Sequence, residues 1–155
     1  MQPTKLEKIV AVYERFGADI AGVPDQWARR LHHTSSGVAD SVYTLLDKDG
    51  APKPSQLASG LEQGLRETPG IIAAVSTQWR PVVAQAFRNA IATEYPDFFS
   101  KEPQRLDKIL VRGHIKTESE FYLVRHFVDL LEGEPDAATK VAQLYAMLDA
   151  YELRA

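Results

Sequence analysis

The sequence predicts an all-α fold, a single-domain helical bundle of about six or seven helices with short loops. Two observations predict this fold. Apolar residues recur at i, i+3, i+4 and i+7 along nearly the whole chain, which is the spacing of one buried helix face. Proline, glycine and capping residues separate the periodic segments, and no segment shows the strict alternation of a half-buried strand. The chain has 155 residues, so we assign residues 1–155 to one domain.

The composition excludes several classes of protein. There is no cysteine, which rules out disulfides, thiolate catalysis and cysteine-ligated metals. The net charge of −3 argues against a strongly basic nucleic-acid binder. The longest apolar runs, 9–13 and 71–75, fall far short of the ~18–20 residues that a membrane span needs. We therefore expect a cytoplasmic protein outside the membrane, without metal or cofactor.

The first helix is expected from about Lys5 to Phe16. Thr4 and Glu7 have the spacing of a capping box, in which each side chain accepts a hydrogen bond from the other's backbone N–H. Gly17 suits the left-handed cap that ends many helices. The apolar face of this helix comprises Leu6, Ile9, Val10, Tyr13 and Phe16.

Residues 24–47 are expected to be helical, either as one bent helix or as two. Pro24 is suited to open a helix that carries Trp27 and Leu31, because a first turn does not need its missing N–H. The hydroxyls of residues 34–36 are candidate N-caps for a following segment. The apolar face of that segment comprises Val38, Val42, Leu45 and Leu46.

A loop is expected at 49–54, where glycine and two prolines interrupt the pattern. Ser55 is a candidate cap for the next helix, in which leucine recurs every fourth residue at 57, 61 and 65. Gly60 and Gly64 form a neighbouring row of small residues, which would allow another helix to approach closely. Residues 68–70 are expected to break the chain again.

The segment 71–93 is expected to be helical, with Pro81 either kinking the helix or starting a new one. An aromatic loop follows at 95–99. Pro103 is expected to open a helix that ends at Gly113. Thr117 and Glu120 predict a second capping box and a helix to about residue 131, and a last helix is expected from about residue 136.

The chemical motifs in the sequence are weak. The run 47–50 fails as a calcium loop, because no register supplies the oxygen donors, the glycine and the final glutamate together. The histidines, His32, His33, His114 and His126, lack the i, i+4 spacing of zinc proteases. The hydroxyls of residues 34–36 beside His33 are explained as helix caps. We therefore assign no catalytic or metal-binding residue, and an enzyme is the third alternative.

Residues 101–126 carry the strongest cluster of positive charge, across the outline of a helix–turn–helix. A binder of anions or nucleic acid would use this segment, although interleaved acids leave it only mildly positive and the second helix looks like a core helix. This alternative assigns anion binding to Arg105, Lys108, Arg112, Lys116 and Arg125.

Aromatic residues that flank one helix support the preferred hypothesis. Trp, Tyr, Phe and Arg are enriched at the centres of protein interfaces. We expect a protein-interaction module that binds another protein, or itself as a homodimer, through apolar and aromatic helix surface. The expected contact residues are Trp79, Arg80, Tyr95, Phe98 and Phe99.

Overall fold

The computed structural model describes residues 2–100 and 102–154, apart from the side chains of Phe99 and Ser100. The predicted all-α fold is confirmed, and the described residues contain no strand. The α-helices are α1 (Lys5–Asp19), α2 (Gln26–Ser36), α3 (Val38–Leu46), α4 (Pro54–Ile72), α5 (Arg80–Glu94), α6 (Glu102–Arg112), α7 (Glu118–Leu131) and α8 (Ala138–Arg154). Two short 3-10 helices, η1 (Pro96–Ser100) and η2 (Pro135–Ala137), precede α6 and α8.

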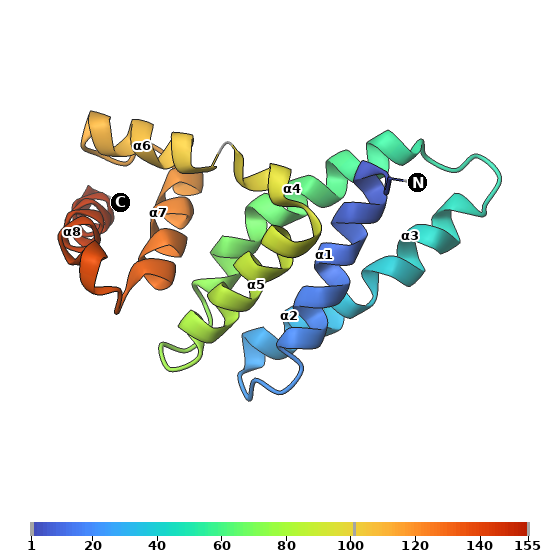
Figure 1. Ribbon diagram of the computed structural model, residues 1–155, viewed down its shortest axis with the longest axis horizontal. Coiled ribbons are helices and arrows are strands. Elements are labelled where there is room, and N and C mark those ends of the chain that lie inside the picture. Colours follow the sequence, from blue (N-terminus) through green and yellow to red (C-terminus); the bar gives the residue numbers. More distant parts are fainter. Residues whose placement is uncertain (1, 101, 155) are drawn as a thin grey trace.

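The helices form an elongated bundle in which α1 is central to one end (Figure 1). α1 packs against α2, α3, α4 and α5, whereas α6 and α8 lie at the opposite end and contact α7. α7 joins the two ends because it also packs against α4 and α5. Within the described part of the chain, no helix combines the length and the apolar character that crossing a membrane requires.

The capping box of α1 is confirmed. The Glu7 amide donates to Thr4 Oγ1 at 3.1 Å, and the Thr4 amide donates to Glu7 Oε1 at 3.3 Å. The expected end at Gly17 is wrong, because α1 continues to Asp19. Gly17 instead lies buried inside the helix, where an added Cβ would be 2.8 Å from Ser36 Oγ. It allows α2 to approach α1 closely.

The segment 24–47 forms two helices separated by Gly37. Pro24 was expected to open α2, and this expectation is wrong. Asp25 is the N-cap of α2 and accepts hydrogen bonds from the amides of Trp27 and Ala28. The hydroxyls expected to cap α3 are also misplaced. Residues 34–36 form the last turn of α2, and α3 begins at Val38 with Gly37 as an N-cap that makes no side-chain hydrogen bond.

α4 begins earlier and ends later than expected. Lys53 is its N-cap in place of Ser55, and the Lys53 amide donates to Gln56 Oε1 at 3.2 Å. The helix also continues through residues 68–70, with Pro69 buried inside it. Thr68 Oγ1 donates to the Gly64 carbonyl at 2.8 Å, and Gly70 packs against the Tyr122 ring of α7. The expected break at residues 68–70 is therefore wrong. Pro69 lies inside α4, between a threonine that bonds to the helix backbone and a glycine that packs against α7.

Three boundaries in the second half are set by proline, glycine and threonine. Pro81 lies in the first turn of α5, so it starts a new helix and does not kink one. Gly113 follows α6 with a positive φ of 88°, as expected for a left-handed helix end. Thr117 caps α7, but Glu120 accepts from the Lys116 amide and not from the Thr117 amide. The second capping box is therefore only half confirmed.

The core is divided into two hydrophobic clusters. The first is formed by α1–α5 and η1, and the rings of Phe16 and Phe87 meet in it with centroids 5.3 Å apart. The second is formed by α6–α8 and by Ile115, which precedes α7. Buried His126 and Asp129 lie on α7 between the two clusters. The helical periodicity of the sequence predicts buried faces but does not reveal this division.

Candidate functional site

The aromatic residues expected to form one partner-binding surface lie at opposite ends of α5. Trp79 and Arg80 are at its beginning, whereas Tyr95 and Phe98 follow its end. A helix of 15 residues separates the two groups by about 22 Å. Tyr95 and Phe98 are only 8% and 9% exposed and belong to the first cluster, so the expectation that they are exposed is wrong. The Phe99 side chain lies outside the described residues.

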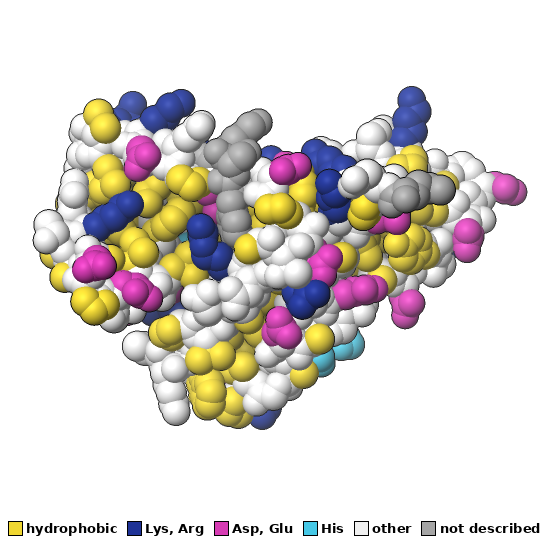
Figure 2. Space-filling view, viewed as in Figure 1, with side chains coloured by type: hydrophobic (Ala, Val, Ile, Leu, Met, Phe, Trp, Pro, Cys, Tyr) yellow, Lys and Arg dark blue, Asp and Glu magenta, His cyan; other side chains and the backbone are white. Residues whose placement is uncertain are grey.

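The beginning of α5 retains some exposed apolar surface. Figure 2 shows hydrophobic side chains gathered at the lower edge of the molecule, where α5 begins beside the α1–α2 connection. Val82 near the start of α5 and Ile71 at the end of α4 are exposed, while Trp79 packs against the first cluster. Arg80 is held inward, since its Nη2 donates to the Val75 carbonyl at 3.0 Å. Arg80 is therefore not free to contact a partner in this arrangement.

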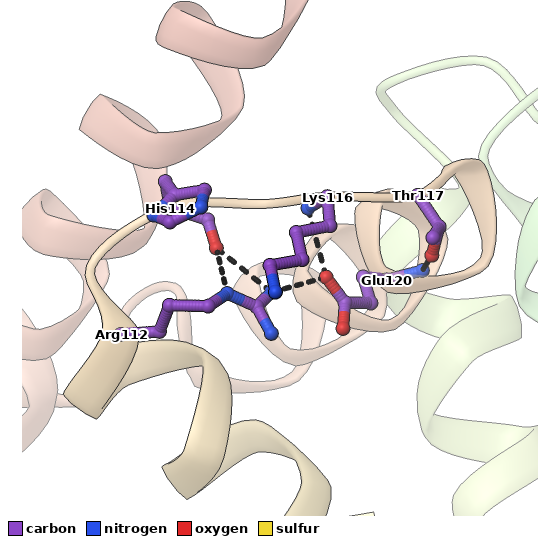
Figure 3. A network of polar contacts seen from close by, with 5 residues as sticks. All are labelled: Arg112, His114, Lys116, Thr117 and Glu120. Carbon is purple, nitrogen blue, oxygen red and sulfur yellow. Dashed lines mark hydrogen bonds and ion pairs between the residues drawn. The ribbon is translucent and has the colours of Figure 1, made fainter.

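The basic residues of 101–126 are partly used inside the fold. Figure 3 shows Arg112 reaching across the α6–α7 connection. Its Nε and Nη2 donate to the His114 carbonyl at 3.1 and 2.9 Å, and Nη2 also pairs with Glu120 Oε1. Burial opposes ionisation of Glu120, but hydrogen bonds from the Lys116 amide and Arg112 lower its pKa. Arg112 therefore fastens α6 to α7.

The other four basic residues of this set do not all have the same environment. Lys108 and Lys116 are exposed, and Arg105 is exposed on α6. Arg125 is half-buried on α7, where its charge acts on Asp129. The structure therefore does not favour one continuous anion-binding surface made from all five residues.

The histidines have different environments as well. His32 Nδ1 lies 2.7 Å from the Gly17 carbonyl, within hydrogen-bonding distance across the α1–α2 contact. His126 is buried between the two clusters, and His33 and His114 are exposed. Among the residues that the structure describes, no three side chains of metal-ligating type are grouped closely enough to hold an ion.

An apolar groove lies between α2–α3 on one side and α4 on the other. Its volume is about 530 Å³. Valine and leucine side chains dominate it, with histidine, hydroxyl and amide groups beside them. The groove is lined by His33, Thr34, Gly37, Val38, Ser41, Val42, Leu45, Gln56, Leu57, Gly60 and Leu61. No carboxylate, ammonium or guanidinium group is among these lining residues.

The groove is open to solvent along its length. Leu45 is 38% exposed, which is unusual for a leucine that lines an apolar surface next to the core. Gly60 lies in the groove, and a Cβ added to it would meet no atom within 4 Å. The groove therefore has room for a side chain that the protein itself does not supply.

Gly60 and Gly64, expected to act together in close helix packing, have different surroundings. An added Cβ at Gly64 would overlap the Tyr13 hydroxyl, so this glycine does allow α1 and α4 to approach closely. Gly60 has no such neighbour, and the expectation is wrong for it. A glycine inside a helix costs about 1 kcal/mol relative to alanine. At Gly60 no packing contact within the described residues explains that cost.

Sequence reasoning missed the groove because periodicity marks apolar faces without showing what covers them. Val38, Val42 and Leu45 were expected to face inward together. Val42 is buried in the first cluster, but Leu45 is left at the edge of the groove. The isolated glycine at position 60 is the one signal in the sequence that points to this place.

Comparison of the chain with protein-family models, with curated proteins and with solved structures gives no match. The geometry of the groove is therefore the basis for inferring a function.

Proposed function

We propose that the protein is an interaction module that binds an amphipathic helix of another protein in the groove between α3 and α4. The observation that carries this proposal is the open apolar groove of about 530 Å³, with unfilled space above Gly60. Binding of an amphipathic helix in a hydrophobic groove is a common mode of protein recognition.

The open shape of the groove favours a helix over a small apolar molecule. Small-molecule pockets cover about 70–90% of the surface of their ligand. A small molecule in this groove would keep one side in contact with water, because the groove is open where Leu45 is exposed. An amphipathic helix needs cover only along one stripe, because its other face is polar.

The dimensions and the chemistry of the groove define the occupant. α3 has 9 residues, so it flanks a helix over about 13 Å, or two to three turns. Two or three anchors at i, i+3 or i+4, and i+7 would fill this length. The anchors would be uncharged, since the lining residues include no group that could pair with a buried charge. Thr34, Ser41 and Gln56 would bond the polar residues that flank the stripe.

The test is selection from a display library of peptides, with the wild-type protein as bait and a Gly60→Leu variant for counter-selection. The leucine would extend into the groove from a Cβ that has no neighbour within 4 Å. Gly22→Leu is the matched control, since Gly22 is equally open but lies outside the groove. We expect selected peptides to carry an apolar stripe at helical spacing and to become helical on binding, as seen by circular dichroism.

Gly60→Leu should weaken binding of these peptides at least tenfold, or about 1.4 kcal/mol, and Gly22→Leu should leave it unchanged. The proposal fails if Gly60→Leu weakens the binding of no selected peptide, or if the selected peptides share no apolar stripe. It also fails if sedimentation shows that the wild-type chain closes the groove by pairing with a second copy and Gly60→Leu abolishes that pairing.

A further inference from the structure

A second and more enclosed cavity lies among α1, α4, η1 and α6, away from the groove. Its volume is about 200 Å³. In contrast to the groove, it is lined largely by charged side chains. The lining residues include Lys5, Glu62, Arg66, Tyr95, Glu102 and Arg105.

The charges contributed by α1 and α4 are already paired. Glu62 binds Lys5 Nζ through Oε2 and Arg66 Nη2 through Oε1, each at 2.7 Å. The Tyr95 hydroxyl lies 3.3 Å from Glu62 Oε2 as a third donor. Burial opposes ionisation of Glu62, but these partners lower its pKa. Each charged side chain on this side of the cavity therefore already has an ion-pair partner, although one carboxylate serves two cations.

The charges contributed by α6 are not matched in this way. Glu102 is only 7% exposed, and its Oε2 has no hydrogen-bond partner among the described residues. Leaving a buried carboxylate without a donor is costly. Arg105 follows one turn later on α6, lines the same cavity and is exposed. The buried Glu102 and the exposed Arg105 thus line one small cavity.

We propose that this cavity binds a small zwitterion of the α-amino acid class, with its ammonium group against Glu102 and its carboxylate against Arg105. An ammonium in the cavity would bring hydrogen-bond donors and a positive charge to the Glu102 carboxyl group. The guanidinium of Arg105 matches a carboxylate through two parallel hydrogen bonds. The cavity is smaller than the roughly 300–1,000 Å³ typical of pockets for larger ligands, which favours a ligand of this size.

Binding of an ammonium group would change the protonation of Glu102. Burial raises the pKa of Glu102 to about 7, although Arg88 and Arg105 oppose this rise. Near neutral pH a fraction of the molecules therefore carries the proton. An ammonium favours the ionised carboxylate, so its binding should release a proton. A simple anion would favour the protonated form and cause proton uptake.

The experiment is isothermal titration calorimetry of the common L-α-amino acids, one at a time, near pH 7 in two buffers with different ionisation enthalpies. Propylamine and propionate serve as probes that carry only one of the two charges. Glu102→Gln and Arg105→Gln remove the two proposed contacts. Lys108→Gln is the matched control, because Lys108 is exposed on the same helix and does not line the cavity. Circular dichroism establishes that each variant is folded.

We expect at least one amino acid to bind wild type and Lys108→Gln with proton release. Its affinity should fall at least tenfold in Glu102→Gln and in Arg105→Gln, and the proton release should disappear in Glu102→Gln. The proposal is overturned if no amino acid binds at millimolar concentration. It is equally overturned if propionate or propylamine binds as tightly as every amino acid, or if binding takes up a proton.

Discussion

The Tyr13 hydroxyl occupies the space that a side chain at Gly64 would need. Tyr13 Oη donates to the Leu61 carbonyl at 2.7 Å, so α1 is hydrogen-bonded to the backbone of α4. An added Cβ at Gly64 would overlap this hydroxyl, whereas the next ring atom, Cζ, would be 3.7 Å away. The contact between the two helices therefore requires both the tyrosine and the glycine.

Gly64→Ala should lower the free energy of unfolding by roughly 1–3 kcal/mol, because the overlap displaces the hydroxyl from its acceptor. Urea denaturation measures the change. Tyr13→Phe removes the one atom that overlaps. In the Tyr13→Phe background, Gly64→Ala should therefore lower the free energy of unfolding much less than in wild type. An equal decrease in both backgrounds would contradict the explanation.

Gly60→Ala should have the opposite effect. The position is helical and its added Cβ meets no atom within 4 Å, so the gain in helix propensity is not offset. We expect the free energy of unfolding to rise by about 1 kcal/mol. Thermal and urea denaturation of the two single variants, run side by side, compare the glycines directly. A loss of stability in Gly60→Ala would mean that the groove is filled from within.

Glu102→Gln should be more stable than wild type, and this difference in the free energy of unfolding should grow as the pH rises. The folded pKa of about 7 lies above the ordinary value of 4.5, so the folded state binds more protons between these values. Glu102 therefore makes the wild type lose stability from pH 4.5 to 7. The advantage of the variant should grow over this window by up to roughly 3 kcal/mol. Glu14→Gln, at an exposed position on α1, is the control for the loss of a carboxylate.

His126→Met should stabilise the protein most in acid. Burial lowers the pKa of His126 to about 3 from 6.5, so the wild type loses stability as the pH falls from 6.5 toward 3. Neither ring nitrogen has a hydrogen-bond partner among the described residues. Removing these two nitrogens should raise the free energy of unfolding by roughly 1–3 kcal/mol at neutral pH and by more below pH 6. Urea midpoints measured from pH 4 to 8 test both parts, and a gap that narrows in acid would count against the buried neutral histidine.

Arg112 and Glu120 should be energetically coupled. Each of Arg112→Ala and Glu120→Ala removes part of the connection between α6 and α7, and each should cost roughly 1–2 kcal/mol. The double variant should cost clearly less than the sum, since the first substitution already breaks the shared contact. Lys108→Ala, on the same helix, is the control with little effect. Strict additivity would show that the two side chains do not act together.

Local signals in the sequence predict much of the secondary structure. The Thr4–Glu7 capping box and the left-handed Gly113 act through neighbouring residues, so a short stretch of sequence contains their cause. Residues 68–70 are a counterexample. Pro69 and Gly70 favour a break locally, but the ring of Tyr122, more than 50 residues away, packs on this part of α4. A contact at that distance leaves no local trace.

The candidate site was harder to predict for the same reason. The spacing of Leu57 and Leu61 predicts an apolar face, and both side chains do pack against the first cluster. Which part of an apolar face stays uncovered depends on how neighbouring helices diverge. For the same reason Tyr95 and Phe98, which composition alone marked as interface residues, are core residues.

The polar layer on α7 sets how the two proposed binding events relate mechanically. His126 and Asp129 place buried polar side chains on α7, the helix that joins the two ends of the bundle. The groove belongs entirely to the end that contains α1, so an occupant of the groove would not contact the helices of the other end. The Glu102 cavity bridges α4 and α6, and a ligand within it would brace one end of the molecule against the other.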